Sequence, residues 1–480
     1  MATSYKTPGV YIEEIPKLPP SVAQVETAIP VFIGYTEKSG IEGSPLPTAL
    51  IDSITVTEAK RITSLLEYET YFGKGVNETL TVSIDETYTA TTPSVLKSRV
   101  ISASVATPSV HTMYYHMQMY FANGGGPCYI VSVGNTSGST ISHTNLIAGL
   151  KMSSRYDEPT LLVFPQAAKI SAASDAYDVY DTALLEAGKL QDRFVVMDCH
   201  GDDTETLRAV SGIGTTNLKY GAAYHPFLRT SLNYQYTLDT LTVAWKSDRN
   251  DDGDYTDTDE KDETAAAYSS LTTELQSLVK LEIDKLRVVL PPSSSVVGVY
   301  ALVDSTRGVW KAPANVSLNL VSGLTKQVTA EDQANLNVDT TAGKSINVIR
   351  AFTGKGILIW GARTLAGNDN EWRYISVRRF FNMVEESSKK ATEGFVFEAN
   401  DSTTWIKVQG MLENFLVTLW RQGALQGAKP EHAFYVAVGL NKTMTALDIL
   451  EGRMIVEIGM AVVRPAEFII LRFSHKLAES

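Results

Sequence analysis

The clearest fold signal in the chain is TLLVFPQAAKISAASDAYDVYDTALLEAGKLQDRFVVMD, residues Thr160–Asp198. Its two ends, Thr160–Pro165 and Arg193–Asp198, are short apolar runs of the kind that parallel sheets bury on both faces. Between them, Asp175–Leu190 has the apolar spacing of a helix. Because strand–helix–strand order is typical of a parallel sheet covered by helices, this stretch predicts an α/β layer.

Elements of the same kinds precede this stretch. Ala28–Lys38 predicts a buried strand followed by a turn, and Ile62–Phe72 predicts a short amphipathic helix. Thr112–Phe121 predicts a further helix, which leads through the glycines at 124–126 into a strand over Cys128–Val133. The N-terminal half of the chain therefore mixes strands and helices in alternation.

Two segments interrupt the α/β pattern. Residues 76–110 are rich in Ser, Thr and Val and predict a small β insertion. Residues 231–265 begin with a β-like pattern and become strongly acidic, since residues 246–263 hold nine acidic and three basic side chains. Such a charged run favours a solvated position at the surface.

Residues 371–480 predict two helices followed by strands. One helix is expected over Glu371–Glu393, with Asp369 as its cap and Gly394 as its end. A second helix is expected over Thr404–Arg421, with its apolar side chains on one stripe. The strands are expected at Ala433–Val438, Arg453–Val463 and Glu467–Phe473.

Composition limits the class of protein. The 480 residues suggest about three domains, and 44% hydrophobic residues are typical of a soluble globular chain. No apolar run approaches the ~20 residues of a membrane span, and the N-terminal sequence lacks the pattern of a signal peptide. With two cysteines, Cys128 and Cys199, the chain cannot build a disulfide framework, so folding in a reducing cytoplasm is expected.

The net charge of −12 argues against nucleic-acid binding, because phosphate contacts require clustered Lys and Arg. This charge is also uneven. Residues 371–480 hold 13 basic and 13 acidic side chains, so residues 1–370 carry the whole −12. The asymmetry indicates that the two parts of the chain have different surroundings.

Catalytic motifs are weak in this sequence. The TAGKS of Thr341–Ser345 resembles the end of a phosphate loop, but Val338 stands where that loop needs its first glycine. Cys199 beside His200 suggests a thiol nucleophile, yet neighbours on a strand point to opposite faces. An α/β hydrolase-like enzyme remains an alternative, although the chain has no G-x-S-x-G nucleophile motif.

One acidic motif predicts a metal site. The segment DRNDDGD, which starts at Asp248, matches the opening D-x-[DN]-x-[DN]-G of a calcium loop, in which alternate oxygen ligands wrap a hard cation. Position twelve holds an Asp in place of the usual bidentate Glu, and the flanking helices of an EF-hand are not evident. A solvated acidic loop and a calcium-binding surface protein both remain open. The candidate ligands are Asp248, Asn250, Asp252, Asp254 and Asp259.

Several sequence motifs that carry no catalytic residues occur along the chain in a distinctive order. They include TPGVYIEEI (Thr7–Ile15), YFANGGGPCYIVSVG (Tyr120–Gly134), INVIRAFTGKGILIWGARTL (Ile346–Leu365), EWRYISVRRFF (Glu371–Phe381) and RPAEFIILRF (Arg464–Phe473). In this order they resemble the contractile tail sheath proteins of myophages, R-type bacteriocins and phage-like extracellular injection systems.

The resemblance implies a mixed α/β, multi-domain fold, with a conserved inner domain built from both ends of the chain. An N-terminal β arm is expected over 1–20, and a middle or outer α/β region over 21–75, 111–230 and 266–340. This region is interrupted by a small β insertion over 76–110 and an acidic surface insertion over 231–265. A conserved sheath domain is expected over 341–480 and ends in a C-terminal β arm.

The resemblance also implies which residues make contacts between subunits. Each arm is expected to add a strand to a small sheet of a neighbouring copy. The arm residues are Val10, Tyr11 and Ile12 at the N-terminus and Phe468, Ile469, Ile470 and Leu471 at the C-terminus. Basic residues of the conserved domain, expected to face an inner tube, are Arg373, Arg378, Arg379, Lys389 and Lys390.

The implied function is mechanical rather than enzymatic. Sheath subunits polymerise as stacked hexameric rings around a tube, and contraction drives the tube through a target envelope. The implied partners are copies of the chain itself, the inner tube protein, baseplate and tail-terminator or cap proteins, and sibling sheath proteins. No cofactor is expected apart from calcium at the acidic loop, and no nucleic acid or membrane insertion. Assembly is expected in the bacterial cytoplasm, as part of a phage tail or tail-like particle.

Overall fold

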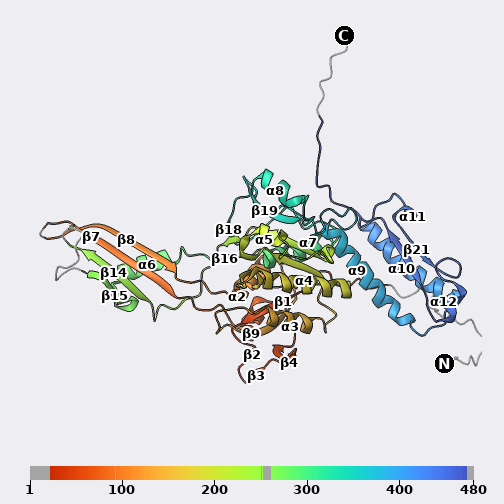
Figure 1. Ribbon diagram of the computed structural model, residues 1–480, viewed down its shortest axis with the longest axis horizontal. Helices are drawn as coiled ribbons and strands as arrows, with labels where there is room; N and C mark the ends of the chain where they lie inside the picture. The colour runs from red at the N-terminus through yellow and green to blue at the C-terminus, as the bar shows by residue number, and fades with distance from the viewer. Residues whose placement is uncertain (1–21, 92, 250, 252–260, 473–480) are drawn as a thin grey trace, which may run out of the picture. The chain divides into compact units, whose positions relative to one another are not determined.

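The computed structural model describes residues 22–91, 93–249, 251 and 261–472, which form two compact units (Figure 1). The central unit comprises Glu26–Asn382 together with the chain from Pro465 onward. The C-terminal unit comprises Met383–Arg464 together with the segment that ends at Val25. The predicted boundary at residue 341 therefore lies too early, because the strands that follow it belong to the central sheet.

The central sheet is mostly parallel, as Thr160–Asp198 predicts. Its strand order is β17-β20-β19-β12-β11-β10-β1-β9-β6, in which β9, β1, β10, β11, β12 and β19 run parallel and the outer strands are antiparallel. The bounds are β1 Pro30–Thr36, β6 Lys60–Ile62, β9 Cys128–Asn135, β10 Leu161–Val163, β11 Phe194–Asp198, β12 Gly221–His225, β17 Val316–Ser317, β19 Ile346–Phe352 and β20 Gly356–Ile359.

Helices cover both faces of this sheet, and β1 shows how. Val31 and Ile33 belong to the apolar cluster formed with α3 (His143–Ser153) and α4 (Ala173–Leu190). Phe32 points the other way, into the cluster formed with α1 (Leu65–Phe72), α2 (Met113–Ala122) and α7 (Ser293–Arg307). Each such side chain contributes ~1.5–3 kcal/mol on burial. Burial on both faces explains why these strands are continuous apolar runs.

A second sheet belongs to an insertion module, which both predicted insertions build together. Its order is β15-β14-β7-β8, from β7 (Leu80–Tyr88), β8 (Leu96–Val105), β14 (Thr242–Asp248) and β15 (Lys261–Ala267). The prediction treated residues 76–110 and 231–265 as separate, but β14 pairs in parallel with β7. Helix α6 (Thr273–Ile283) covers one face with Leu275 and Val279.

The C-terminal unit combines long helices with a small antiparallel sheet. Helix α9 (Ile375–Thr392) begins in the central unit, and α10 (Ser402–Arg421) is capped by Asp401, whose carboxylate accepts the Thr404 N–H. The sheet pairs β21 (Phe434–Val438) with β22 (Val456–Met460). The unit also contains α11 (Pro430–Ala433) and α12 (Ala446–Leu450).

The predicted start of the first helix of this region is wrong. The first helix begins at Ile375 and not at Glu371, because Asp369 accepts the N–H groups of Glu371 and Trp372 in a turn ahead of it. The described residues 467–472 of the predicted strand Glu467–Phe473 form neither helix nor strand in the single chain; this strand is expected in a sheet of a neighbouring copy and stays a prediction. A strand needs a pairing partner, and this segment has none within the described chain.

The remaining elements belong to the central unit and include a small sheet in the order β16-β13-β18. They are β2 Gly40–Ile41, β3 Ser44–Pro45, β4 Thr48–Ile51, β5 Ile54–Thr57, α5 Thr204–Arg208, β13 Leu228–Thr230, β16 Val289–Leu290, β18 Val321–Leu324 and α8 Ala330–Asn337. Across the described residues, no helix has both the length and the apolar character needed to cross a bilayer.

Candidate assembly site

The C-terminal segment exposes four consecutive apolar side chains. Phe468, Ile469, Ile470 and Leu471 are between 71% and 79% exposed, which is unusual for large aliphatic and aromatic groups. An extended apolar segment with unpaired main-chain groups is a template for pairing with another chain. These are the residues predicted as the C-terminal arm. The predicted N-terminal arm residues Val10, Tyr11 and Ile12 lie outside the described residues.

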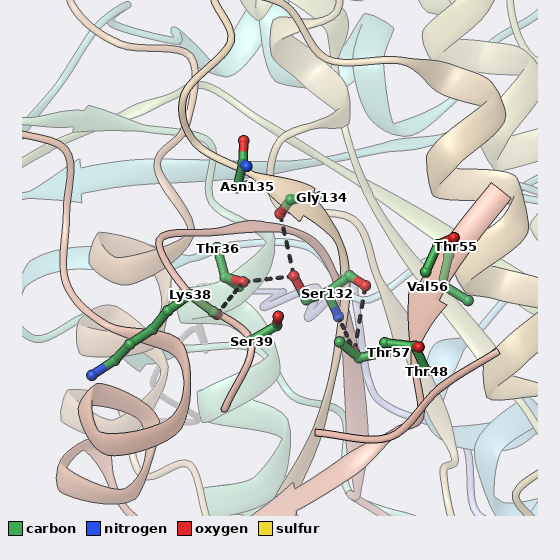
Figure 2. Close-up of a pocket in the computed structure, with 10 residues that line it drawn as sticks. All are labelled: Thr36, Lys38, Ser39, Thr48, Thr55, Val56, Thr57, Ser132, Gly134 and Asn135. Atoms are coloured by element: carbon green, nitrogen blue, oxygen red, sulfur yellow. Dashed lines mark hydrogen bonds between the residues drawn. The ribbon is translucent and has the colours of Figure 1, made fainter. Parts of the chain in front are cut away.

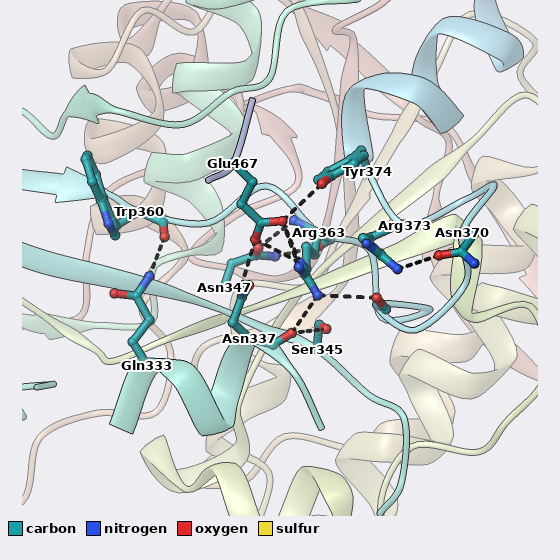
Figure 3. Close-up of polar contacts among 11 residues, drawn as sticks. Gln333, Asn337, Ser345, Asn347, Trp360, Arg363, Asn370, Arg373, Tyr374 and Glu467 are labelled. Atoms are coloured by element: carbon teal, nitrogen blue, oxygen red, sulfur yellow. Dashed lines mark hydrogen bonds and ion pairs between the residues drawn. The ribbon is translucent and has the colours of Figure 1, made fainter. Parts of the chain in front are cut away.

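The residue immediately before this segment is held firmly (Figure 3). Arg363 donates to both oxygens of the Glu467 carboxylate, from Nε to Oε1 at 2.9 Å and from Nη2 to Oε2 at 2.7 Å. Asn337 Nδ2 donates to Oε1 at 2.7 Å, and the Tyr374 hydroxyl donates to Oε2 at 3.0 Å. We call Arg363, Asn337 and Tyr374 the Glu467 anchor site.

The charges of this site are largely shielded from water. The Arg363 side chain is 4% exposed and that of Glu467 is 22% exposed. Burial by itself raises the pKa of Glu467, but the bonds from Arg363 and Asn337 outweigh it and hold the pKa below its ordinary value. Bidentate arginine–carboxylate pairs of this kind fix both partners in direction as well as in distance. Glu467 is therefore ionised at neutral pH.

The basic residues predicted to face a tube occupy two different environments. Arg378 and Arg379 are 2% and 4% exposed, so the prediction that they meet a partner is corrected. Arg378 donates to Asn382 Oδ1 at 2.6 Å and lies over the Trp372 ring. Arg379 pairs with Asp304 at 2.6 Å. Both side chains therefore hold the subunit itself together.

The other three basic residues keep some exposure. Arg373 donates to Asn370 Oδ1 at 2.7 Å. Lys389 and Lys390 lie near Glu386 at 3.1 and 3.5 Å, with side chains 62% and 38% exposed. The lysines at the end of α9 thus retain charge at the surface, where the prediction of a tube contact stays a prediction.

The predicted calcium loop falls mostly outside the described residues, which include Asp248 but not Asn250, Asp252, Asp254 or Asp259. Asp248 ends β14 and is 5% exposed, and its Oδ1 accepts the Asp251 N–H at 2.6 Å. A grouping of acidic, His or Cys side chains suited to a metal does not occur among the described residues. The calcium site stays a prediction.

The residues that suggested catalysis are built into the fold. Lys344 of the phosphate-loop-like string is 4% exposed and donates to the Ile213 carbonyl. Burial raises the pKa of the Cys199 thiol well above its ordinary value, which opposes formation of a nucleophilic thiolate. His225 and Asp202 form a pair at 3.0 Å, but Asp202 also accepts the Phe227 N–H and the Thr325 hydroxyl. Each of these groups therefore has a structural explanation.

A buried carboxyl with a raised pKa lies at the end of β11. Asp198 is fully buried, and burial raises its pKa to about 7 although its Oδ1 accepts the Ser293 N–H at 2.8 Å. Perturbed carboxyls often mark active sites, but this one is inaccessible to a substrate. It contacts the start of α7, so its role is in the packing of that helix against the sheet.

This raised pKa predicts a loss of stability as pH rises. A carboxyl whose pKa is higher in the folded than in the unfolded chain binds more protons when folded, so stability falls between about pH 4 and pH 7. Asp198→Asn removes this titration. When thermal unfolding is measured across pH 5–8, the Tm of the variant minus the Tm of the parent should therefore increase as pH rises. A constant difference in Tm would contradict the assignment.

A polar cavity of about 180 Å³ lies at the ends of β1 and β9 (Figure 2). Its hydroxyl groups bond mainly to one another and to backbone: Thr36 Oγ1 and Ser132 Oγ lie 2.6 Å apart, and Thr57 Oγ1 accepts the Ser132 N–H. The Lys38 ammonium extends away from these groups. The cavity therefore shows no arrangement of groups for acid–base or nucleophilic chemistry.

Similarity to known proteins agrees with an assembly role. Residues 367–476 match the family model of the phage tail sheath C-terminal domain. The tail sheath protein of Enterobacteria phage T4 is 22% identical over 319 residues, which are 65% of this chain and 44% of that protein. The tail sheath protein of Vibrio phage KVP40 is 24% identical over 136 residues, 28% of this chain and 20% of that protein. The matched region thus spans less than half of either phage protein.

Solved structures match over nearly the whole chain. The contracted helical sheath of the anti-feeding prophage is 30% identical, with 98% of this chain and all of that chain covered and a TM-score of 0.64. The contracted PVC sheath complex of an extracellular contractile injection system is 30% identical, with 99% of both chains covered and a TM-score of 0.61. A chain of the anti-feeding prophage baseplate, 6-fold symmetrised, is 31% identical with a TM-score of 0.63, covering 99% of this chain and 100% of that chain. This chain belongs to the contractile sheath protein family.

Proposed function

We propose that this chain is the subunit of a contractile sheath and polymerises with copies of itself, as stacked hexameric rings around an inner tube. The observation that carries the proposal is the exposed apolar segment Phe468–Leu471, in a chain that matches sheath structures from end to end. Such a segment can add a strand to a sheet of a neighbouring copy, where its main-chain groups find partners. The small sheet of β21 and β22 is a suitable acceptor, because an antiparallel pair leaves edges to which strands can be added.

Contraction of this sheath would drive the tube outward. An extended sheath is a kinetically trapped state, and rotation of the subunits into tighter packing releases the free energy that performs the work. Strands exchanged between copies keep the subunits joined during rotation, because their main-chain hydrogen bonds move with them. Baseplate, cap and tube proteins, and sibling sheath proteins, are the proposed partners. The insertion module, which contains the described part of segment 231–265, is proposed to lie on the outer sheath surface, and assembly to occur in the bacterial cytoplasm.

Removal of residues 1–15 tests this function. Co-expressed with the tube protein, the full chain is expected to form long tubes in negative-stain electron micrographs. The truncated chain should remain soluble and unpolymerised, because it lacks the N-terminal arm. Long tubes from the truncated chain would contradict strand exchange through this arm. Monodisperse particles from the full chain would contradict the sheath function itself.

A further inference from the structure

The Glu467 anchor site lies on the central unit, although the chain reaches it directly from the C-terminal unit. The division between the two units falls between Arg464 and Pro465. Two residues later, Glu467 binds Arg363 and Asn337, which both belong to the central unit. The exposed apolar segment starts with the next residue, Phe468. The arm therefore leaves the subunit from a point that is attached to the central unit.

The anchor site is in turn attached to the middle of the central sheet. The Arg363 N–H donates to Asn347 Oδ1 at 2.8 Å, and Asn347 lies on β19. Asn347 Nδ2 donates back to the Arg363 carbonyl at 2.7 Å and to the Ala223 carbonyl of β12 at 3.3 Å. The next residue but one, Leu365, donates its N–H to the Gly221 carbonyl at 2.8 Å. Arg363 is thus tied to two neighbouring strands.

Side-chain and backbone groups fix the guanidinium on its other side. Arg363 Nη1 donates to the carbonyls of Asn337, the last residue of α8, and of Gly367. A side chain at position 367 would collide with Ser345 Oγ, which itself donates to the Asn337 carbonyl (Figure 3). These bonds hold the Arg363 guanidinium in one orientation, so its carboxylate partner is also held in one place.

We propose that the Glu467 anchor site positions the C-terminal arm for exchange and transmits load on the arm to the central sheet. This inference rests on the proposed sheath function and adds the point of attachment to it. The ligand of the site is a carboxylate of the same chain, and the positioned group is the apolar strand that a second copy receives. Glu467 and Arg363 act as positioning residues, since neither needs to touch the neighbouring copy.

Pre-ordering explains why an anchor at this place matters. Fixing the backbone of one residue costs ~1–2 kcal/mol, and a segment ordered in the free subunit does not incur this cost again on association. Without the Glu467 bonds, the arm loses its attachment to the central unit, and the preceding backbone bond joins the Val463 N–H to the Ala424 carbonyl in the C-terminal unit. Several more residues must then be ordered on assembly. We expect the critical concentration for polymerisation to rise about tenfold or more.

Glu467→Gln tests the proposal with little change in shape, and Tyr374→Phe removes the hydroxyl that donates to Glu467 Oε2. The matched control is Glu371→Gln, which alters an exposed carboxylate on the same unit. Sedimentation of polymer over a concentration series should give the order Glu467→Gln, Tyr374→Phe, then control and parent, from highest to lowest critical concentration. Parent-like polymerisation of Glu467→Gln would overturn the anchor. A parent chain that forms no polymer would instead count against the sheath function.

A spectroscopic measurement on the unpolymerised chain separates positioning from a general loss of stability. Cys128 and Cys199 are both fully buried, so a cysteine introduced at the exposed Ala466 can be labelled selectively with a nitroxide. With Glu467 present the label should give a restricted spectrum, and with Glu467→Gln a mobile one, in a chain that stays folded although its Tm falls because the buried Arg363 loses a charged partner. Identical spectra in the two chains would overturn the proposal, and so would a variant that unfolds globally.

Discussion

Replacement of Phe468, Ile469, Ile470 and Leu471 by serine should abolish polymerisation and leave the isolated subunit as stable as the parent. In the free chain these side chains are at least 71% exposed, so the substitutions remove almost no buried surface from the folded state. In a neighbouring sheet each would be buried, and full burial of such a side chain contributes ~1.5–3 kcal/mol. The loss over four residues is about 6–12 kcal/mol, which is comparable to the whole binding free energy of a micromolar contact, about 8 kcal/mol.

Thermal unfolding measures whether the subunit stays as stable as the parent. Electron microscopy measures whether it polymerises. Leu66→Ser and Leu185→Ser provide controls, since both leucines are more than half exposed but lie on helices of the central unit. These controls should still form tubes. Tubes from the four-serine variant would show that the segment makes no essential contact. Failure of the controls as well would show that any loss of exposed apolar surface prevents assembly.

Asp304→Ala should destabilise the subunit by ~3–5 kcal/mol, because it leaves the Arg379 guanidinium buried without its partner. The two side chains are 3% and 5% exposed and form two bonds, of 2.6 and 3.1 Å. Thr27 completes the arrangement: its hydroxyl donates to Asp304, and its carbonyl accepts from Arg379. The pair thereby joins α7, α9 and the chain that leads into β1.

Chemical denaturation of the subunit measures this effect. The double variant Asp304→Leu with Arg379→Met is expected to recover most of the stability, because apolar groups of similar size often replace a buried ion pair without loss. Thr306→Ala is a suitable control on the same helix, since Thr306 is exposed and donates only to the Leu302 carbonyl. A cost below about 1 kcal/mol for Asp304→Ala would mean that water reaches the arginine.

The sequence predicted the parts of the fold that follow from local pattern. The strands β1, β10 and β11 are apolar runs buried on both faces, and α4 and α10 carry apolar stripes at helical spacing, so each is visible within a short window. The pairing of β14 with β7 is not visible in this way. The two strands are far apart in the chain. Because they are parallel, no tight turn joins them that the sequence could reveal.

The candidate site was predictable only in part, for a related reason. The apolar run after Glu467 is evident in the sequence, and the resemblance to sheath proteins predicts that it is an arm. The partners of Glu467 come from three separate segments, which only the fold brings together. Arg378 and Arg379 were predicted to face a tube because the resemblance places the conserved domain against it, and charged side chains are rarely buried. A buried arginine depends on a partner such as Asp304, which helical periodicity cannot reveal.

The insertion module has a consequence for how this chain can change over time. Because β7 and β8 come from one insertion and β14 and β15 from another, the loss of either segment alone would leave the other with an uncovered apolar face. We therefore expect relatives of this chain to have both insertions or neither. For the same reason, a foreign domain added to the chain is best placed at the β7–β8 turn. An addition there leaves the pairing of β7 with β14, which joins the two insertions, in place.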